Sequence, residues 1–188
     1  MIAALMSLPD SLEDKNHNVR VGIGIASGQV RREVRDGFEH RFGIPLLEVY
    51  SMTEMGVLLC SERLSDRRPG SCGHTYGWGE ICIVDQNDNP VAAGTTGQIL
   101  LRPKVNNTSM IRYVNKNEET IAAWKNFWYH TGDIGKLDQD GYVYYVGREA
   151  HWIRRGGENI SAFEVEKVIT SHPNVADCAA VGLSLIHI

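Results

Sequence analysis

Apolar residues recur every four positions across residues 30–42: Val30, Val34, Phe38 and Phe42. The residues between them are mostly charged: Arg31, Arg32, Glu33, Arg35 and Asp36. This pattern predicts an amphipathic helix, which Gly43 ends in a left-handed cap. Apolar stretches at 21–26 and 44–50 flank the helix and are short enough to be buried strands. A strand, a helix and a strand in this order predict a right-handed crossover in a parallel sheet.

Further along the chain, short apolar stretches alternate with turn residues. Residues 81–84 and 98–102 predict two paired strands, and residues 142–146 predict another. The Asp-Gly step within 138–141 is a strong hairpin signal. Residues 118–124 predict a short helix between two sheets. The middle of the chain is therefore expected to be rich in antiparallel β structure.

A helix start is encoded near the end of the chain. Ser161 and Glu164 have the spacing of a capping box, in which each side chain binds a backbone amide of the first turn. The following residues carry an apolar stripe: Phe163, Val165, Val168 and Ile169. His172-Pro173 predicts the end of the helix. Only about one further strand, at 175–181, is expected, so the stripe lacks most of a domain to pack on and the chain looks cut short.

The last six residues, Leu183–Ile188, are expected to be an artefact. They can be encoded by codons that resemble the transposon end used to fragment DNA for sequencing, and such scars are left out of fold reasoning. An ordinary strand is the alternative. We expect the genuine protein sequence to stop being recorded near Gly182.

The formal net charge is −4, from 19 Lys and Arg against 23 Asp and Glu. This balance argues against a broad basic surface for nucleic acid, and 43% hydrophobic residues argue against disorder. The apolar run Met1–Met6 is far shorter than a membrane span, and no basic residue precedes it as in a secretion signal. Four cysteines show no metal-ligand spacing and no dense disulfide pattern: Cys60, Cys72, Cys82 and Cys178. A reduced cytoplasm is the expected location.

Residues Tyr50–Glu54 follow the end of a predicted strand, where open α/β sheets place ligand sites. The Thr53 hydroxyl is suited to donate to a phosphate oxygen, and the Glu54 carboxylate is a hard oxygen ligand for Mg²⁺. The alternative is that this Thr-Glu pair simply caps a helix.

A second candidate lies in Tyr129–Asp133, a predicted turn at a strand edge. A carboxylate at Asp133 would accept both hydroxyl protons of a ribose in charge-assisted hydrogen bonds, and Arg148 is placed to reach the same ligand. The alternatives are an Asx turn that closes a loop and a surface arginine paired with some carboxylate.

Residues 154–159 combine two arginines with a doubled glycine before the capped helix, which suits a phosphate ligand or an ordinary solvated turn. Residues 138–141 begin like a calcium loop, but acidic ligands do not follow at the required spacing, so a hairpin turn is expected. No histidine has metal-ligand spacing, which argues against zinc. The Gly-x-Ser-x-Gly elbow of serine hydrolases is missing.

Taken in order, these motifs resemble the adenylate-forming superfamily of acyl-CoA synthetases, adenylation domains and luciferases. The resemblance runs from about Val21 to Gly182. The matching segments are Ala26–Gly28 (a small-residue turn near adenine), Tyr50–Glu54 (Tyr-Gly-x-Thr-Glu), Gly70–Gly73 (Gly-Ser-x-Gly), Trp128–Asp133 (Trp-Tyr-x-Thr-Gly-Asp), Asp140–Arg148 (the hairpin before the hinge) and Ile153–Glu166 (the opening of the small domain). Within the superfamily, residues 154–161 are most similar to small-acid ligases, including carnitine or crotonobetaine CoA ligases.

The resemblance implies an α/β fold with a β-rich part. Residues 1–149 would be the C-terminal part of the large AMP-binding domain, which is the end of its parallel sheet and a small β subdomain. Residues 150–182 would be the truncated start of the small, mobile α+β domain, joined through a hinge. Residues 183–188 are the artefact.

The resemblance also implies an ATP-dependent acid–thiol ligase, which makes an acyl-AMP from a carboxylic acid and transfers the acyl group to coenzyme A. The residue roles that it implies are adenine binding by Ser27, Gly28 and Tyr50 with Ser51 beside them, phosphate binding by Thr53, Mg²⁺ binding by Glu54, ribose binding by Asp133 and Arg148, and approach of the coenzyme A thiol at Gly156 and Gly157. Thr53 and Glu54 are the expected catalytic residues. Neither nucleic acid nor a membrane span is expected, and the oligomeric state is left open.

The sequence departs from the family pattern at several positions. Ser51 replaces a glycine, Ala150 and His151 replace the usual Lys-Asp of the hinge, and Phe127 stands where a glycine often precedes Trp-Tyr. A Gly-rich phosphate loop and the late lysine that promotes adenylation do not occur in the chain, so we expect this piece alone to be inactive. The alternatives are a degenerate AMP- or ATP-binding module without catalysis and an adenylation domain that loads a carrier protein.

Overall fold

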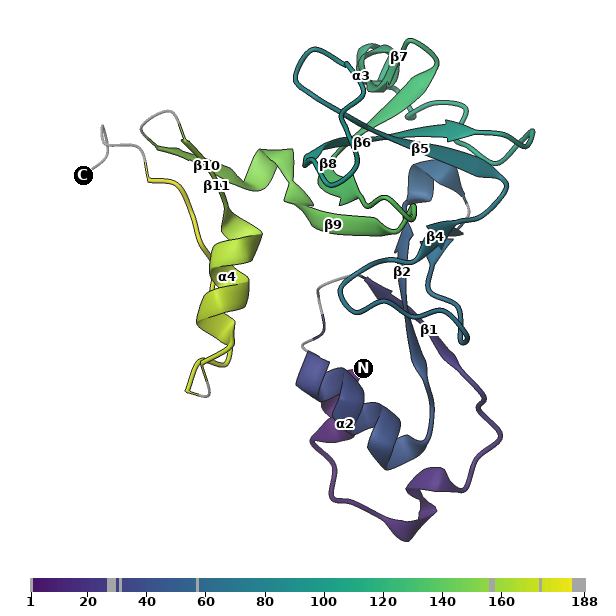
Figure 1. The fold of residues 1–188 in the computed structure, drawn as a ribbon, viewed down its shortest axis with the longest axis vertical. Helices are drawn as coiled ribbons and strands as arrows, with labels where there is room; N and C mark the ends of the chain where they lie inside the picture. The colour runs from purple at the N-terminus through teal and green to yellow at the C-terminus, as the bar shows by residue number, and fades with distance from the viewer. Residues whose placement is uncertain are drawn as a thin grey trace. The chain divides into compact units, whose positions relative to one another are not determined.

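The computed structural model describes residues 2–26, 30, 32–56, 58–155, 158–172 and 174–183 (Figure 1). Four predicted site residues, Ser27, Gly28, Gly156 and Gly157, lie outside these ranges. The chain divides into two compact units, each described by itself. Unit 1 comprises Met1–Glu80, Pro103–Ile111 and Asp140–Tyr144, and unit 2 comprises Ile81–Arg102, Arg112–Gln139 and Tyr145–Ile188.

Unit 1 contains the predicted strand–helix–strand. The strands β1 (Gly22–Ala26) and β2 (Leu46–Ser51) are parallel and are connected through α2 (Arg32–Phe42). The antiparallel strands β3 (Leu58–Ser61) and β4 (His74–Thr75) complete a sheet in the order β1-β2-β3-β4. The parallel crossover is therefore confirmed, and the sheet is mixed.

The helix α2 buries its apolar stripe as the periodicity predicts. Phe38 packs in one buried cluster with Ile44 and Leu46, and residues of the short N-terminal helix α1 (Ile2–Met6) pack against it. Gly43 has a φ of 70°, and its amide donates to the Glu39 carbonyl over 2.8 Å. The predicted left-handed cap is confirmed. A 3₁₀ turn, η1 (Leu12–Lys15), follows α1.

The charged face of α2 differs from the amphipathic expectation, because Arg35 is only 6% exposed. Its guanidinium donates to Glu48 Oε1 over 2.8 Å and to Glu62 Oε2 over 2.6 Å. Glu39, one turn along the helix, accepts from both Arg35 and Arg67. Burial raises the pKa of the Glu39 carboxyl, but these hydrogen bonds outweigh it and hold the pKa below the usual value. The pattern missed this network because Glu48 lies on β2 and Glu62 lies in the segment that follows β3, far from Arg35 in the sequence.

Unit 2 is built on the predicted β-rich middle of the chain. Its sheet has the order β5-β6-β8-β7, with β9 paired to β8. The pairings of β8 with β6 and with β7 are antiparallel. The strand bounds are β5 Gly79–Val84, β6 Gly97–Pro103, β7 Trp124–Lys125, β8 Trp128–Leu137 and β9 Val143–Arg148. The predicted short helix is α3 (Asn117–Ala123).

A hairpin turn joins β8 to β9, as the Asp-Gly step predicts. Gly141 has a φ of 84°, and the Asp140 carboxylate accepts from Arg68 over 2.9 Å. Next to the turn, the Tyr142 hydroxyl donates to Asp66, and this hydrogen bond raises the pKa of Tyr142. Arg68 stabilises the turn, because it pairs with Asp140 and its Cζ lies 3.7 Å from the centroid of the Tyr142 ring.

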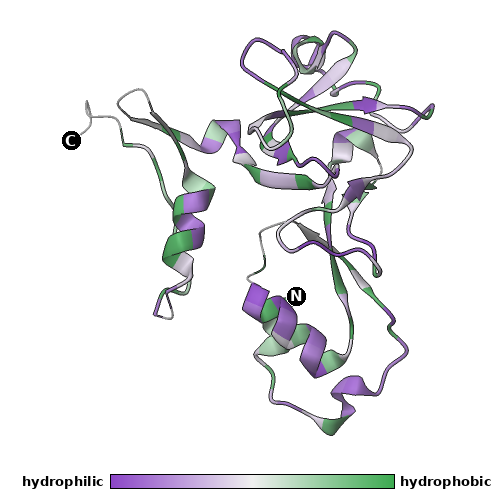
Figure 2. Cartoon of the chain, viewed as in Figure 1, coloured by the Kyte–Doolittle hydropathy of each residue, from purple (hydrophilic) through white to green (hydrophobic). Residues whose placement is uncertain are grey.

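The last elements of the described chain are η3 (Glu149–His151), the antiparallel pair β10 (Trp152–Arg155) and β11 (Glu158–Ser161), and α4 (Ala162–Thr170). The Ser161 hydroxyl accepts from the Glu164 amide over 3.3 Å, as the predicted cap requires. Figure 2 shows apolar residues along α4, and Val168 is 71% exposed.

The prediction of a strand at 175–181 was wrong, because this segment has no helix or strand. A strand needs a neighbouring strand to pair with its backbone. Here the Ala180 amide donates instead to the side chain of Glu166, over 2.9 Å. An apolar stretch predicts burial, but not the presence of a pairing strand.

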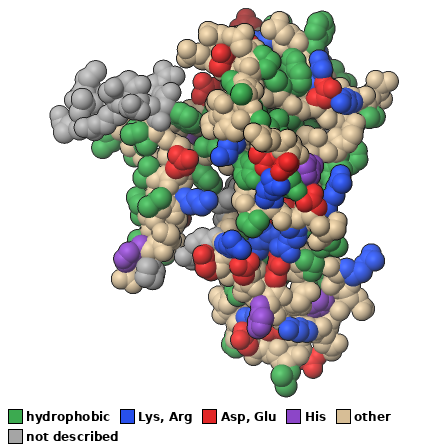
Figure 3. All heavy atoms as spheres, in the orientation of Figure 1, with side chains coloured by type: hydrophobic (Ala, Val, Ile, Leu, Met, Phe, Trp, Pro, Cys, Tyr) green, Lys and Arg blue, Asp and Glu red, His purple; other side chains and the backbone are tan. Residues whose placement is uncertain are grey.

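Surface charge follows the near-balanced composition. On the face that Figure 3 shows, Lys and Arg side chains lie interspersed with Asp and Glu side chains. Within the described ranges, the helices are all too short or too polar to cross a bilayer.

The turn between β7 and β8 carries Asn126 and Phe127 at φ values of 51° and 64°. Two positive φ values are typical of a type I′ turn, for which the second residue is preferably glycine. Phe127 is 88% exposed, so burial does not compensate for its backbone conformation. We expect Phe127→Gly to raise the free energy of unfolding by roughly 0.5 to 1 kcal/mol. Glycine relieves the left-handed strain, and part of this gain is lost because glycine also raises the entropy of the unfolded chain.

Urea unfolding followed by circular dichroism measures this gain. Asn126→Gly is the control, because asparagine tolerates the left-handed region and less is gained by replacing it. A lower urea midpoint for Phe127→Gly than for the parent chain would contradict the prediction.

Candidate functional site

The clearest candidate site is a carboxylate–guanidinium pair in unit 2. Arg148, the last residue of β9, donates from Nε to Asp133 Oδ1 on β8 over 2.9 Å. The side chain of Asp133 is 6% exposed and that of Arg148 is 56% exposed. The sequence predicted that these two residues reach one ligand, and the structure brings them together. The arginine thus orients a buried carboxylate while its own exposed part remains accessible to a ligand.

An irregularity in the pairing of β6 with β8 sets the position of Asp133. Gln98 pairs with Ile134 and Leu100 pairs with His130, so three residues of β8 lie opposite the single residue Ile99. This is a bulge, a feature that re-aims side chains next to functional sites. Gly132, at its centre, has a φ of 68°. The Asx-turn alternative is not what the structure shows, since Asp133 lies inside a strand.

The second candidate group lies in unit 1, directly after β2. Thr53 and Glu54 begin a 3₁₀ turn, η2 (Thr53–Met55), whose N-cap is Met52 without a side-chain hydrogen bond. The helix-cap alternative for the Thr-Glu pair therefore does not hold. Thr53 is exposed and Glu54 is half-buried. The Glu54 carbonyl also accepts from the Met110 amide over 2.6 Å, which fastens the turn.

Tyr50 and Ser51 differ in accessibility at the end of β2. Tyr50 is 7% exposed, whereas Ser51 is exposed. An adenine would therefore find little of the Tyr50 ring to stack on in this structure. Within residues 50–54, Ser51 and Thr53 are the exposed residues. The Thr53–Glu54 group belongs to unit 1 and the Asp133–Arg148 pair belongs to unit 2, so each group is described by itself.

The chemistry of Thr53 and Glu54 fits a magnesium ion brought in by phosphates. Mg²⁺ is usually held by one or two carboxylates together with substrate phosphates and water. Glu54 offers one carboxylate beside one hydroxyl. The described part of the chain contains no group of three or more His, Cys, Asp or Glu able to hold a metal. A dedicated protein cage for a metal is thus not seen there.

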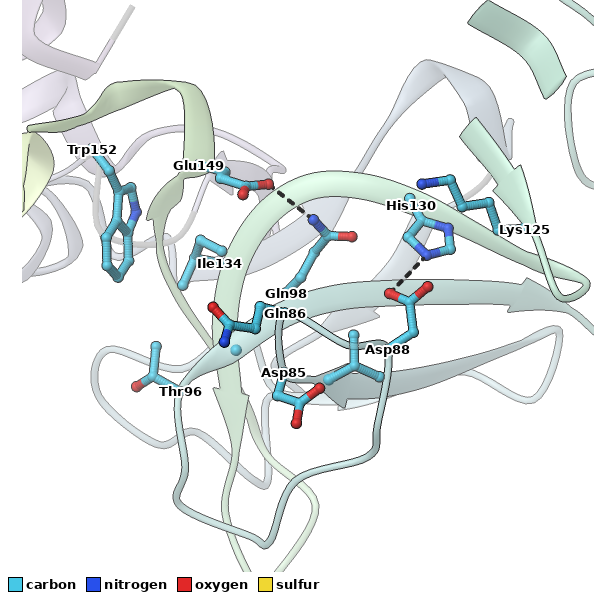
Figure 4. Close-up of a pocket in the computed structure, with 12 residues that line it drawn as sticks. Asp85, Gln86, Asp88, Thr96, Gln98, Lys125, His130, Ile134, Glu149 and Trp152 are labelled. Carbon is cyan, nitrogen blue, oxygen red and sulfur yellow. Dashed lines mark hydrogen bonds and ion pairs between the residues drawn. The ribbon is translucent and has the colours of Figure 1, made fainter. Parts of the chain in front are cut away.

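A pocket of about 610 Å³ in unit 2 was missed by the sequence reasoning (Figure 4). It is lined by Ile134 and Glu149, the residues that follow Asp133 and Arg148, and by Trp152 at the start of β10. The Gln98 amide donates to Glu149 Oε2 over 3.0 Å. This hydrogen bond fixes η3, where the hinge is expected, to β6. The residues that line the pocket are scattered over the sequence, so no sequence motif indicates the pocket.

The Gly-Ser-x-Gly motif has a structural role in unit 1. The Cys72 amide donates to the Val143 carbonyl over 2.7 Å, and the Val143 amide donates to the Gly73 carbonyl over 3.0 Å. Ser71 and Cys72 are fully buried. Burial also raises the pKa of the nearby Cys60 thiol well above its ordinary value, which disfavours the reactive thiolate.

The fold of the chain is that of the adenylate-forming class. The family model described as AMP-binding enzyme matches residues 1–110. The chain therefore belongs to the AMP-binding enzyme family.

The curated relatives include the crotonobetaine/carnitine–CoA ligases of Salmonella paratyphi C and Salmonella typhi. Each is 36% identical over 188 residues, and the match covers 97% of this chain and 35% of the relative. The chain thus spans about a third of the length of these relatives.

The solved structures that resemble the chain include an anthranilate CoA ligase in complex with anthranoyl-AMP, with a TM-score of 0.80 and 29% identity over 97% of this chain and 35% of that one. Another is an O-succinylbenzoate coenzyme A synthetase from Bacillus subtilis in complex with AMP, with a TM-score of 0.81 and 27% identity over 97% of this chain and 37% of that one. The expected fold class and the resemblance to adenylate-forming enzymes are confirmed.

Proposed function

We propose that the chain is part of an ATP-dependent acid–thiol ligase that makes acyl-coenzyme A. The observation that carries this proposal is the Asp133–Arg148 pair, a buried carboxylate oriented by an accessible arginine over 2.9 Å, in a member of the AMP-binding family. The ionised carboxylate is a strong acceptor for two neighbouring hydroxyls, as on a ribose.

In the first half-reaction, an oxygen of the substrate carboxylate attacks the α-phosphorus of ATP. The bond between the α-phosphorus and its bridging oxygen breaks, which gives acyl-AMP and pyrophosphate. Thr53 would donate a hydrogen bond to a phosphate oxygen, and Glu54 would hold the Mg²⁺. When bound, this ion neutralises charge that develops on the phosphate oxygens. Asp133 and Arg148 would hold the ribose, which fixes the direction of attack.

In the second half-reaction, the thiol of coenzyme A adds to the acyl carbonyl, loses its proton and expels AMP. A small carboxylic acid is the proposed substrate class, supported by the names of the relatives, which are crotonobetaine/carnitine–CoA ligases. We expect the 188-residue chain alone not to complete this reaction, because the Gly-rich phosphate loop and the late lysine implied by the resemblance are not in it. A cytoplasmic location is proposed, supported by four cysteines that form no disulfide.

The test uses the complete protein, obtained by extending the reading frame that contains this chain. We expect Asp133→Asn to weaken ATP binding roughly 10- to 100-fold, because the hydrogen bonds to the ribose would no longer be assisted by the charge of a carboxylate. Glu54→Gln should instead mainly lower the rate of acid-dependent pyrophosphate release. Calorimetry measures the affinity and a coupled assay measures pyrophosphate.

Glu119→Gln is the control, because Glu119 is a carboxylate of unit 2 whose side chain is 57% exposed and pairs with Lys116 over 3.8 Å. It should leave ATP affinity within about twofold, as a change at a surface ion pair allows. Equal affinity of the parent protein and Asp133→Asn for ATP would refute the proposed ribose site. Failure of the parent protein to release pyrophosphate with any carboxylic acid would refute the ligase activity.

A further inference from the structure

The bulge in β8 leaves backbone groups that the strand ladder does not pair. Ile99 stands alone opposite Thr131, Gly132 and Asp133. Ile99 is fully buried, so water does not reach this part of β6. A buried backbone carbonyl or amide without a partner destabilises the fold by about as much as a lost hydrogen bond. The bulge therefore needs a local side chain to bind these groups.

Thr131 supplies that side chain. Its hydroxyl donates to the Ile99 carbonyl over 2.7 Å and accepts from the Asp133 amide over 2.9 Å. One oxygen thus bridges β6 to the backbone of the residue that carries the carboxylate. The two bonds fix the backbone amide of Asp133, and with it the direction in which its side chain leaves the strand.

We propose that Thr131 is a positioning residue, which aims the Asp133 carboxylate at the vicinal hydroxyls of a ribose. The inference rests on the proposed function, because it needs Asp133 to bind ribose. Thr131 itself touches no ligand in this scheme. Its effect is to hold the carboxylate where both of its oxygens meet both hydroxyls, so that a nucleotide lacking one hydroxyl binds less well.

Charge and burial support a positioning role for Thr131. Arg148 holds one oxygen of Asp133 through Nε, but the arginine is half exposed and lies at a strand end. The backbone amide of Asp133 is held where the bulge is closed, because it donates to the Thr131 hydroxyl over 2.9 Å. The left-handed Gly132 between them has open space around a built Cβ, so sterics do not lock the turn. The hydroxyl bridge therefore stabilises the geometry of the bulge through a specific pair of hydrogen bonds.

The experiment compares affinity for ATP with affinity for 2′-deoxy-ATP and 3′-deoxy-ATP in the complete protein. The parent protein should bind ATP roughly 10-fold more tightly than either deoxy analogue, as expected for one charge-assisted hydrogen bond. Thr131→Val keeps the shape but removes both hydrogen bonds, and we expect it to reduce this preference to about twofold. Thr131→Ser keeps the hydroxyl and should retain the preference.

The matched control is Thr120→Val. Thr120 makes the same kind of bridge in unit 2, since its hydroxyl donates to the Lys116 carbonyl over 2.7 Å and accepts from the Tyr113 amide over 3.0 Å. Its loss should lower stability but leave the preference for ribose intact. Comparison of Thr131→Val with Thr120→Val thus distinguishes a positioning role of Thr131 from a general loss of stability.

Gly132→Ala provides a second route if Thr131→Val does not fold. A φ of 68° strains alanine without any steric contact, so the bulge should relax and the preference for ribose should fall. A full preference in whichever of these two variants folds would overturn the inference. If Asp133→Asn also keeps the preference, the proposed ribose site fails; if only the Thr131 and Gly132 variants keep it, the positioning role alone fails.

Discussion

Replacing Arg35 by methionine should lower the free energy of unfolding by about 3 to 5 kcal/mol, the range for a buried ion network that loses one partner. Glu62 and Glu48 are 1% and 7% exposed, and both accept from Arg35. Without the arginine, two buried carboxylates would face each other with no cation between them. The bonds of Arg35 to Glu39 over 3.3 Å and to the Leu46 carbonyl over 2.6 Å would also be lost.

Urea unfolding of the 188-residue chain measures this effect. Arg32→Met is the control, because Arg32 and its partner Asp36 are 71% and 61% exposed and such pairs contribute only about 0.5 kcal/mol. Adding Glu48→Gln and Glu62→Gln to Arg35→Met removes the stranded charges and should recover much of the loss. Equal losses for Arg35→Met and Arg32→Met would show that the network does not stabilise unit 1.

Gly73→Ala should be nearly as damaging, with a loss of about 3 kcal/mol from left-handed strain and overpacking together. A Cβ at this position would lie 2.1 Å from the Ser61 carbonyl oxygen and 2.4 Å from the Glu62 nitrogen. Both contacts are with backbone of residues that are 1% exposed, so neither can move aside easily. Gly73 also has a φ of 73°, which alanine rarely adopts.

Gly70→Ala separates the two causes. Gly70 has a φ of 78°, but its built Cβ has no neighbour within 4 Å. It should lose only the strain, about 1 kcal/mol. Thermal unfolding of both variants gives the difference, which measures the steric contact with β3. Similar losses at the two positions would mean that the loop shifts and that the contact is relieved.

Regular elements of this fold could be predicted because local patterns encode them. The four-residue spacing of Val30 to Phe42 gave α2, and Gly43 gave its end. The Asp-Gly step gave the hairpin between β8 and β9. These features depend on neighbours in sequence, which a pattern contains.

The features that were missed depend on partners far along the chain. Arg35 looks like any other charge on an amphipathic helix until Glu48 and Glu62 are brought to it by β2 and the segment after β3. The role of Tyr50 in stacking on a ligand stays a prediction, and the sequence did not show that the residue is only 7% exposed. Asp133 and Arg148 were predicted to reach one ligand from their places at a strand edge and at the end of the hairpin. The bulge that places Asp133 was not predicted, because no alternation of polar and apolar residues marks it.

The bulge also limits which lengths of chain this strand can accept. Gln98 and Leu100 are two residues apart on β6, and their partners Ile134 and His130 are four apart on β8. Both separations are even, so the strand resumes with its side chains on their original faces. Loss or gain of a single residue within 131–133 would change the bulge, and with it the direction of the Asp133 side chain. Insertions and deletions here should therefore disturb the position of Asp133 even where the strand pairing survives.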